Sequence, residues 1–134
     1  MGRNVVSMLK QYSRYNNYNW NIIVYYNVNA DDKQDILEML YYLHCTGTKA
    51  KTAVNLMSEL NKGFTYTNHY TKTSFVCISE TTSKDELINS IAHEAKHIME
   101  HICINYNIPL EGESSAYMLG EIVMLMFDTF KLLL

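Results

Sequence analysis

The sequence has few of the residues that interrupt a fold. It contains one proline and five glycines in 134 residues, and it has no low-complexity stretch or internal repeat. A composition of this kind gives no sign of an interdomain linker, and a chain of this length forms one hydrophobic core. We therefore expect a single domain over residues 1–134.

Cysteine is also sparse, and Cys45, Cys77 and Cys103 are widely separated, with no CxxC pair. An odd number of scattered cysteines favours buried free thiols in a reducing compartment over a disulfide framework. Long apolar runs are missing as well, because no segment approaches the roughly 18 continuous apolar residues of a membrane span, and no cleavable targeting segment is apparent. We expect a soluble, cytoplasmic protein with no membrane partner.

A strong charge of either sign is absent. The formal net charge of −3 provides no broad attraction to phosphate backbones, so we do not expect nucleic acid as a partner. One local exception lies before Asp31, where basic residues precede any acidic residue and are interleaved with aromatic ones: Arg3, Lys10 and Arg14, with Tyr12, Tyr15, Tyr18 and Trp20. This segment is compatible with a nucleic-acid contact, but we interpret it as a solvated terminal helix over residues 5–14.

Residue patterns predict the remaining elements. β-branched and aromatic runs indicate strands, apolar residues at helical spacing indicate helices, and Ser83 followed by Glu86 is typical of a capping box. We expect, in chain order, a strand over Trp20–Val28, helices from Asp31 or Asp32 to near Gly47 and from about Lys49 to Leu60, a hairpin of Phe64–Asn68 and Ser74–Ser79, and helices from about Lys84 to Tyr106 and from about Glu113 almost to the C-terminus. Strands followed by two long helices indicate an α+β fold.

The helix over 84–106 carries the segment His93-Glu94-Ala95-Lys96-His97. With His93 placed at zero degrees on an α-helix, His97 falls near about 40 degrees and Glu94 near about 100 degrees. The apolar residues fall on the opposite side, between about 140 and 220 degrees; they are Ile88, Ile91, Ala95, Ile98 and Ile102. One face is therefore suited to a core and the other to a site.

Two histidines one helical turn apart can share one metal ion. Their Cβ atoms lie only ~5–6 Å apart, so both imidazoles can reach a zinc ion at ~2.0–2.1 Å. Glu94 lies beside them, where its carboxylate can accept a proton from a bound water and return it to the leaving amine. We predict a Zn²⁺ site with His93 and His97 as ligands and Glu94 as general base and acid. The plainer alternative is a surface helix on which these side chains face water.

Catalytic zinc normally has a third protein ligand. His101 follows on the same side, but eight residues of helix separate it from His93 by roughly 12 Å. The last helix offers Glu113, Tyr117 and Glu121 on one face, with the small residues Ala116 and Gly120 beside them to let the two helices approach. We expect Glu113 to be the third ligand, with Glu121 as the alternative. Tyr117 is our candidate hydrogen-bond donor to the transition state, ahead of His69 and Tyr70.

The HExxH motif followed by His101, together with Glu113-Ser114-Ser115-Ala116, resembles the gluzincin-like metallopeptidases, and within them the short bacterial and phage peptidases of the ImmA/IrrE type. The resemblance covers roughly residues 83–125. It implies a zincin-like fold, with a small antiparallel sheet packed on the HExxH helix and on the C-terminal helix. It also implies zinc at His93, His97 and Glu113, with Glu94 as the base.

We therefore expect a zinc metallopeptidase whose partner is a peptide or protein substrate. The alternative is a catalytically inactive, zincin-like binding or inhibitory protein that acts by docking to another protein. The sequence leaves open whether Ser74–Ser79 is an edge strand that pairs with an extended substrate or an interior strand.

Overall fold

The computed structural model describes residues 7–51, 55 and 63–134. Its strands are β1 (Leu9–Tyr15), β2 (Trp20–Val28), β3 (Phe64–Asn68) and β4 (Thr73–Ser79), and its longer helices are α1 (Lys33–Tyr42), α3 (Lys84–Tyr106) and α4 (Glu113–Phe130). Short 3₁₀ turns cover Asn16–Tyr18, Ala30–Asp32 and Lys131–Leu133. Residues 47–51 are also helical, but most of the helix predicted over Lys49–Leu60 lies outside the described residues.

The prediction of a helix over residues 5–14 is wrong where the structure describes them. Leu9–Tyr15 forms β1, which runs antiparallel to β2 and places Tyr15 opposite Trp20. Burial along this segment alternates, because Gln11 and Tyr15 are buried while Tyr12 is exposed. That period of two residues is the period of a strand with one covered face.

The sheet has the strand order β1-β2-β4-β3, and it is mixed. The outer pairs β1–β2 and β3–β4 are antiparallel, as expected, but the central pair β2–β4 is parallel, so the prediction of a purely antiparallel sheet is wrong. A parallel pair becomes possible because the chain passes through α1 between β2 and the β3–β4 hairpin. All seven residues of β4 are buried. The segment Ser74–Ser79 is therefore interior, and β3 is the edge strand on its side.

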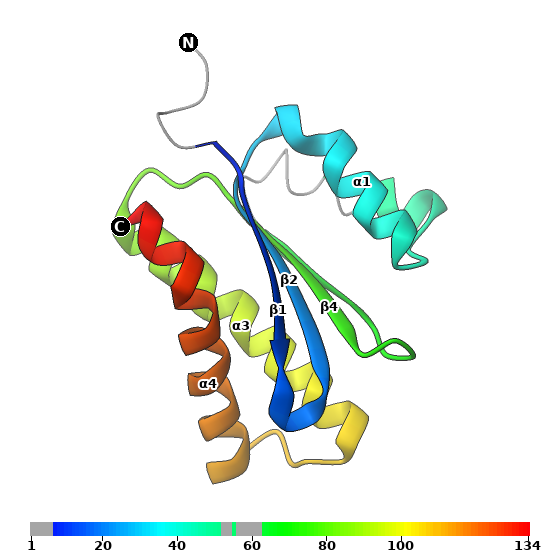
Figure 1. Ribbon diagram of the computed structural model, residues 1–134, viewed down its shortest axis with the longest axis vertical. Coiled ribbons are helices and arrows are strands. Elements are labelled where there is room, and N and C mark those ends of the chain that lie inside the picture. The colour runs from blue at the N-terminus through cyan, green and yellow to red at the C-terminus, as the bar shows by residue number, and fades with distance from the viewer. Residues whose placement is uncertain (1–6, 52–54, 56–62) are drawn as a thin grey trace.

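Helices cover both faces of the sheet (Figure 1). One core lies between the sheet and the helices α3 and α4, and a second lies between the other face and α1. Alternate residues of β2 serve the two cores, since Val24 packs in the first and Tyr25 in the second. The fold is thus an α+β arrangement with the HExxH helix packed on the sheet.

The helices α3 and α4 divide their face of the sheet between them. α3 contacts β3 and β4, whereas α4 contacts β1 at the opposite edge. The side-chain amide of Gln11 on β1 donates a hydrogen bond to the carbonyl of Leu125 on α4, at 2.8 Å. α4 also returns alongside α3 in the reverse direction (Figure 1).

The bounds of α3 follow from its ends. The hydroxyl of Ser83 accepts a hydrogen bond from the backbone N–H of Glu86 at 3.1 Å, as the capping pattern predicts. The carboxylate of Glu86 accepts from Thr82 instead of from Ser83. At the other end, Asn107 takes a left-handed conformation with φ 57° and stops the helix.

The three cysteines are free and buried, as predicted. Burial raises the pKa of the Cys77 thiol, and the nearby charges of Glu94 and Asp32 raise it further. Within the described part of the chain, no helix combines the length and the apolar character needed to cross a membrane.

Candidate metal centre

The histidine face of α3 lies against the edge strand β3. Among the described residues, His93, Glu94 and His97 form a group whose possible ligand atoms all lie within 4.8 Å of one another. His93 is exposed, His97 is half-buried, and Glu94 is buried between the helix and the strand. Solvent therefore contacts the group on the side of the two imidazoles, while the carboxylate lies on its inner side.

The two imidazoles face each other through their Nε2 atoms. These atoms are 3.2 Å apart, and the rings are nearly perpendicular, with an interplanar angle of 83°. Two nitrogens bound to one tetrahedral zinc ion at ~2.0–2.1 Å are about 3.3 Å apart. The observed separation is thus the one that a shared ion requires.

Glu100 fixes the orientation of His97. Its carboxylate lies 3.2 Å from Nδ1 of His97, three residues earlier on the same helix. A carboxylate at this position accepts the Nδ1 proton, which leaves the Nε2 lone pair directed at His93. Hydrogen bonds of this kind orient histidine ligands and increase their basicity.

Glu94 is held by the edge strand. The hydroxyl of Thr65 on β3 donates a hydrogen bond to one carboxylate oxygen of Glu94 at 2.8 Å. No hydrogen bond within the described part of the chain occupies the other oxygen. A carboxylate within 4.8 Å of the two ring nitrogens is at the right distance to reach a shared ion through one water molecule.

A chain of hydrogen bonds determines the protonation of His101. The indole N–H of Trp20 donates to the Ser74 hydroxyl at 2.9 Å, and that hydroxyl is fully buried, with the Thr67 hydroxyl 2.7 Å away. A hydroxyl carries one proton, and Thr67 is the acceptor that the described residues offer to the buried Ser74 O–H, so Ser74 donates to Thr67. Thr67 in turn donates to Nδ1 of His101 at 2.6 Å.

His101 is accordingly a neutral ring that carries its proton on Nε2. Burial lowers the pKa of His101 from its ordinary value of 6.5, and the neighbouring His69 and His97 lower it further. The ring of His69, from the turn between β3 and β4, lies 5.7 Å from the ring of His101, measured between centroids. Four of the five histidines of the chain thus form one row along α3.

The structure does not bring the predicted residues of α4 to the histidines. The buried side of α4 carries Ser115, Met118, Ile122 and Met126, so the face with Glu113, Tyr117 and Glu121 is exposed. Ala116 and Gly120 are exposed too. The prediction that these small residues let the two helices approach closely is therefore wrong. The apolar residues of α4, which recur every four residues, occupy the side that faces the core.

Glu113 and Glu121 lie in separate surroundings. Glu113 opens α4, directly after the turn that follows Tyr106, and thirteen residues of helix separate Tyr106 from His93 by roughly 20 Å. Glu121 accepts hydrogen bonds from the Tyr15 hydroxyl and from Asn17, beside β1 at the far edge of the sheet. Tyr117 is 71% exposed on the outer side of α4.

Sequence reasoning missed three side chains that hold Glu94 or a histidine in place: Thr65, Thr67 and Glu100. Glu100 stands three residues after His97, a spacing that places it on the same side of a helix and that points to this contact. Thr65 and Thr67 are two residues apart on a strand, so they share one face. The sequence does not show which helix packs against that face. Only the fold shows that it is α3.

The arrangement combines two opposed imidazoles, a buried carboxylate beside them and hydrogen bonds that orient both. Its chemistry is that of a site able to hold one transition-metal ion next to a proton acceptor. The chain matches no protein-family model, no curated protein and no solved structure.

Proposed function

We propose that the protein is a zinc-dependent hydrolase that cleaves peptide bonds, with His93 and His97 as metal ligands. The observation that carries this proposal is the 3.2 Å separation of the two Nε2 atoms, with the Glu94 carboxylate beside them. A surface helix with unrelated histidines does not require the rings to face each other, nor a glutamate to be buried next to them.

Each residue has a distinct part in the proposed reaction. A zinc ion, when bound, lowers the pKa of water and polarises a carbonyl group. Glu94 accepts the proton of the attacking water and delivers it to the leaving amine. Thr65 holds the Glu94 carboxylate in place, and Glu100 keeps the Nε2 lone pair of His97 directed at the ion.

The test compares metal content and peptide hydrolysis in matched variants. We expect one zinc per chain by elemental analysis, and Glu94→Gln should keep this zinc while losing hydrolysis of a fluorogenic peptide library by roughly 10²-fold or more. His93→Ala and His97→Ala should lose the zinc itself. Lys96→Gln is the control, because Lys96 is exposed on the same helix and lies outside the group. Undiminished hydrolysis by Glu94→Gln contradicts the proposal.

A second candidate is a protein that acts by docking without catalysis. The observation that favours it is an apolar outer face on α4, where Tyr117 is 71%, Met124 72% and Phe127 46% exposed. Exposed apolar patches of this kind are typical of protein–protein contacts. In this case Met124→Glu should abolish association with the partner protein, Glu94→Gln should leave it unchanged, and the wild-type protein should hydrolyse no peptide of the library.

A further inference from the structure

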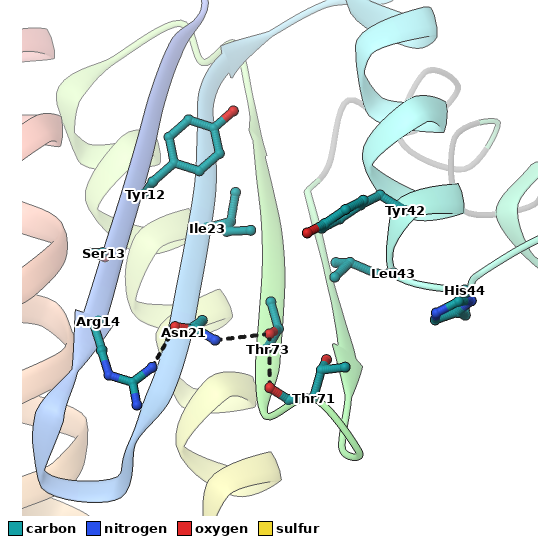
Figure 2. A pocket seen from close by; sticks show the side chains of 10 residues that line it. All are labelled: Tyr12, Ser13, Arg14, Asn21, Ile23, Tyr42, Leu43, His44, Thr71 and Thr73. Carbon is teal, nitrogen blue, oxygen red and sulfur yellow. Dashed lines mark hydrogen bonds between the residues drawn. The ribbon is translucent and has the colours of Figure 1, made fainter.

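A cavity of about 680 Å³ lies on the face of the sheet opposite the histidine row. Figure 2 shows its floor on β2 and β4, where Ile23, Asn21 and Thr73 lie side by side. Tyr12 and Arg14 of β1 form one wall. The other wall is formed by Tyr42 at the end of α1 and by the turn that follows, with His44. Pockets for small ligands commonly measure ~300–1,000 Å³, so this cavity has the size of a binding site.

Arg14 is held in place at the wall of the cavity. Its guanidinium donates a hydrogen bond to the side-chain carbonyl of Asn21 at 2.9 Å (Figure 2). It donates another to the side-chain carbonyl of Asn19 at 3.4 Å. A guanidinium has five N–H groups, so these bonds leave donors available. The charge is thus oriented while part of its hydrogen-bonding capacity stays open.

Among the described residues that line the cavity, none carries a carboxylate. The ion pairs found within the described residues join Lys10 to Asp35 and His97 to Glu100, and neither involves Arg14. The amide of Asn21 accepts from Arg14 and donates to Thr73, and its second N–H remains a further donor. The polar side of the cavity therefore offers a positive charge and hydrogen-bond donors to an anion.

Aromatic and aliphatic side chains form another part of the lining. Tyr12 is 62% exposed and Tyr42 76% exposed, on opposite walls, and the side chain of Ile23 lies on the floor between them. An exposed aromatic wall gives a flat ring a face to pack on.

The wall after α1 is fixed to the sheet. The carbonyl of Leu43 accepts hydrogen bonds from the Tyr66 hydroxyl at 3.3 Å and from the Asn68 amide at 3.0 Å. His44 takes a left-handed conformation, φ 67°, and its N–H donates to the carbonyl of Tyr41. The cavity is accordingly formed before any ligand enters it.

We propose that this cavity binds a small molecule consisting of a planar ring and an anionic group, either carboxylate or phosphate. Arg14 receives the anion, and Tyr12, Ile23 and Tyr42 pack on the ring. The inference is independent of the metal centre. The cavity lies on the opposite face of the sheet, and none of its residues belongs to that centre.

The experiment uses the full chain and two probes that share this chemistry but differ in source. Adenosine 5′-monophosphate represents nucleotides, and 4-hydroxyphenylacetate represents aromatic acids. Two-dimensional NMR titrations should show saturable shifts at Arg14, Asn21 and Tyr42 with at least one probe, and the probe that binds more tightly identifies the source. Where adenosine 5′-monophosphate is the probe that binds, inorganic phosphate and adenosine are its controls, and each should bind at least tenfold more weakly.

Variants separate the two parts of the site. Arg14→Met should weaken binding of the anionic probe at least tenfold, and Tyr42→Ala should weaken binding of the ring. Lys131→Met is the charge-matched control on the C-terminal turn and should bind like the wild type. Both test residues are exposed, so the variants should retain the dispersed spectrum of the fold. Absence of saturable shifts with both probes at ~10 mM, or unchanged affinity in Arg14→Met, would overturn the proposal.

Discussion

The imidazoles of His93 and His97 need no rearrangement to share an ion, because their Nε2 atoms already lie 3.2 Å apart. Spacing in the sequence accounts for this proximity, since residues four apart on a helix are neighbours. Spacing does not account for the orientation of the rings. That depends on Glu100, which holds Nδ1 of His97.

His101 makes the stability of the metal-free protein depend on pH. Its folded pKa is lowered below 6.5, so at mildly acidic pH the unfolded chain binds more protons than the folded one. The free energy of unfolding should therefore decrease as the pH falls through about 6.5, and this decrease should end below the pKa of the folded state. Urea titrations in chelator at several pH values between 8 and 4.5 measure it.

The comparison variant is His101→Gln. It removes the titrating group, so the difference in unfolding free energy between wild type and variant should itself fall with decreasing pH. A difference that stays constant across the range, or that grows, would show that His101 is not held neutral.

At the scale of elements, the edge strand β3 positions the centre as much as α3 does. Thr65 and Thr67 lie on its inner face, and Gly63 brings the start of the strand against β4. A Cβ atom added at Gly63 would lie 2.0 Å from the carbonyl oxygen of Cys77. The close approach of these two backbones explains why a glycine directly precedes the strand.

Two glycine substitutions should therefore have opposite effects. Gly63→Ala should destabilise the fold by about 1–3 kcal/mol, because the added methyl group meets backbone that cannot move aside easily. Gly120→Ala should stabilise it by about 0.5–1 kcal/mol, because Gly120 is exposed on α4 and an added Cβ meets nothing within 4 Å. Thermal and urea unfolding of both variants provide the measurement, and a neutral Gly63→Ala would contradict the described contact.

Local signals explain which elements could be predicted. The bounds of α3 were predictable because Ser83 caps the start of the helix and Pro109 follows its end. β1 was missed because its outward side chains are polar, basic or aromatic and the strand lies at an edge, so the segment contains no apolar run. The covered face of such a strand is recognisable only once its neighbour is known.

At the scale of the whole molecule, the order of the strands decides which residues can meet. α4 lies under β1 and the histidines lie under β3, at the other edge of the sheet. Neither the parallel pairing of β2 with β4 nor this division of the face could be predicted, because both depend on how the chain crosses the sheet. The sequence therefore predicted the histidine pair and Glu94 as a group, but not the surroundings of Glu113 or Tyr117.

The topology predicts which of two glutamates affects zinc affinity. Glu113→Gln should leave zinc affinity unchanged within about twofold, because Glu113 lies near the far end of α3. Glu100→Gln should weaken it by roughly 10–100-fold, because Glu100 orients His97. Competition with a chromophoric chelator measures both affinities. Loss of zinc from Glu113→Gln would mean that α4 packs differently from the arrangement described.

Thr73 and Ser74 are consecutive on β4. Thr73 faces the cavity that Arg14 also lines, whereas Ser74 belongs to the chain of hydrogen bonds that ends at His101. A strand turned over by a single inserted or deleted residue would exchange their faces. Both surfaces of the protein would then be lost in one event, although no residue of the metal group or of the cavity walls had been replaced. Changes of length in this short strand should accordingly be far less tolerable than changes of side chain.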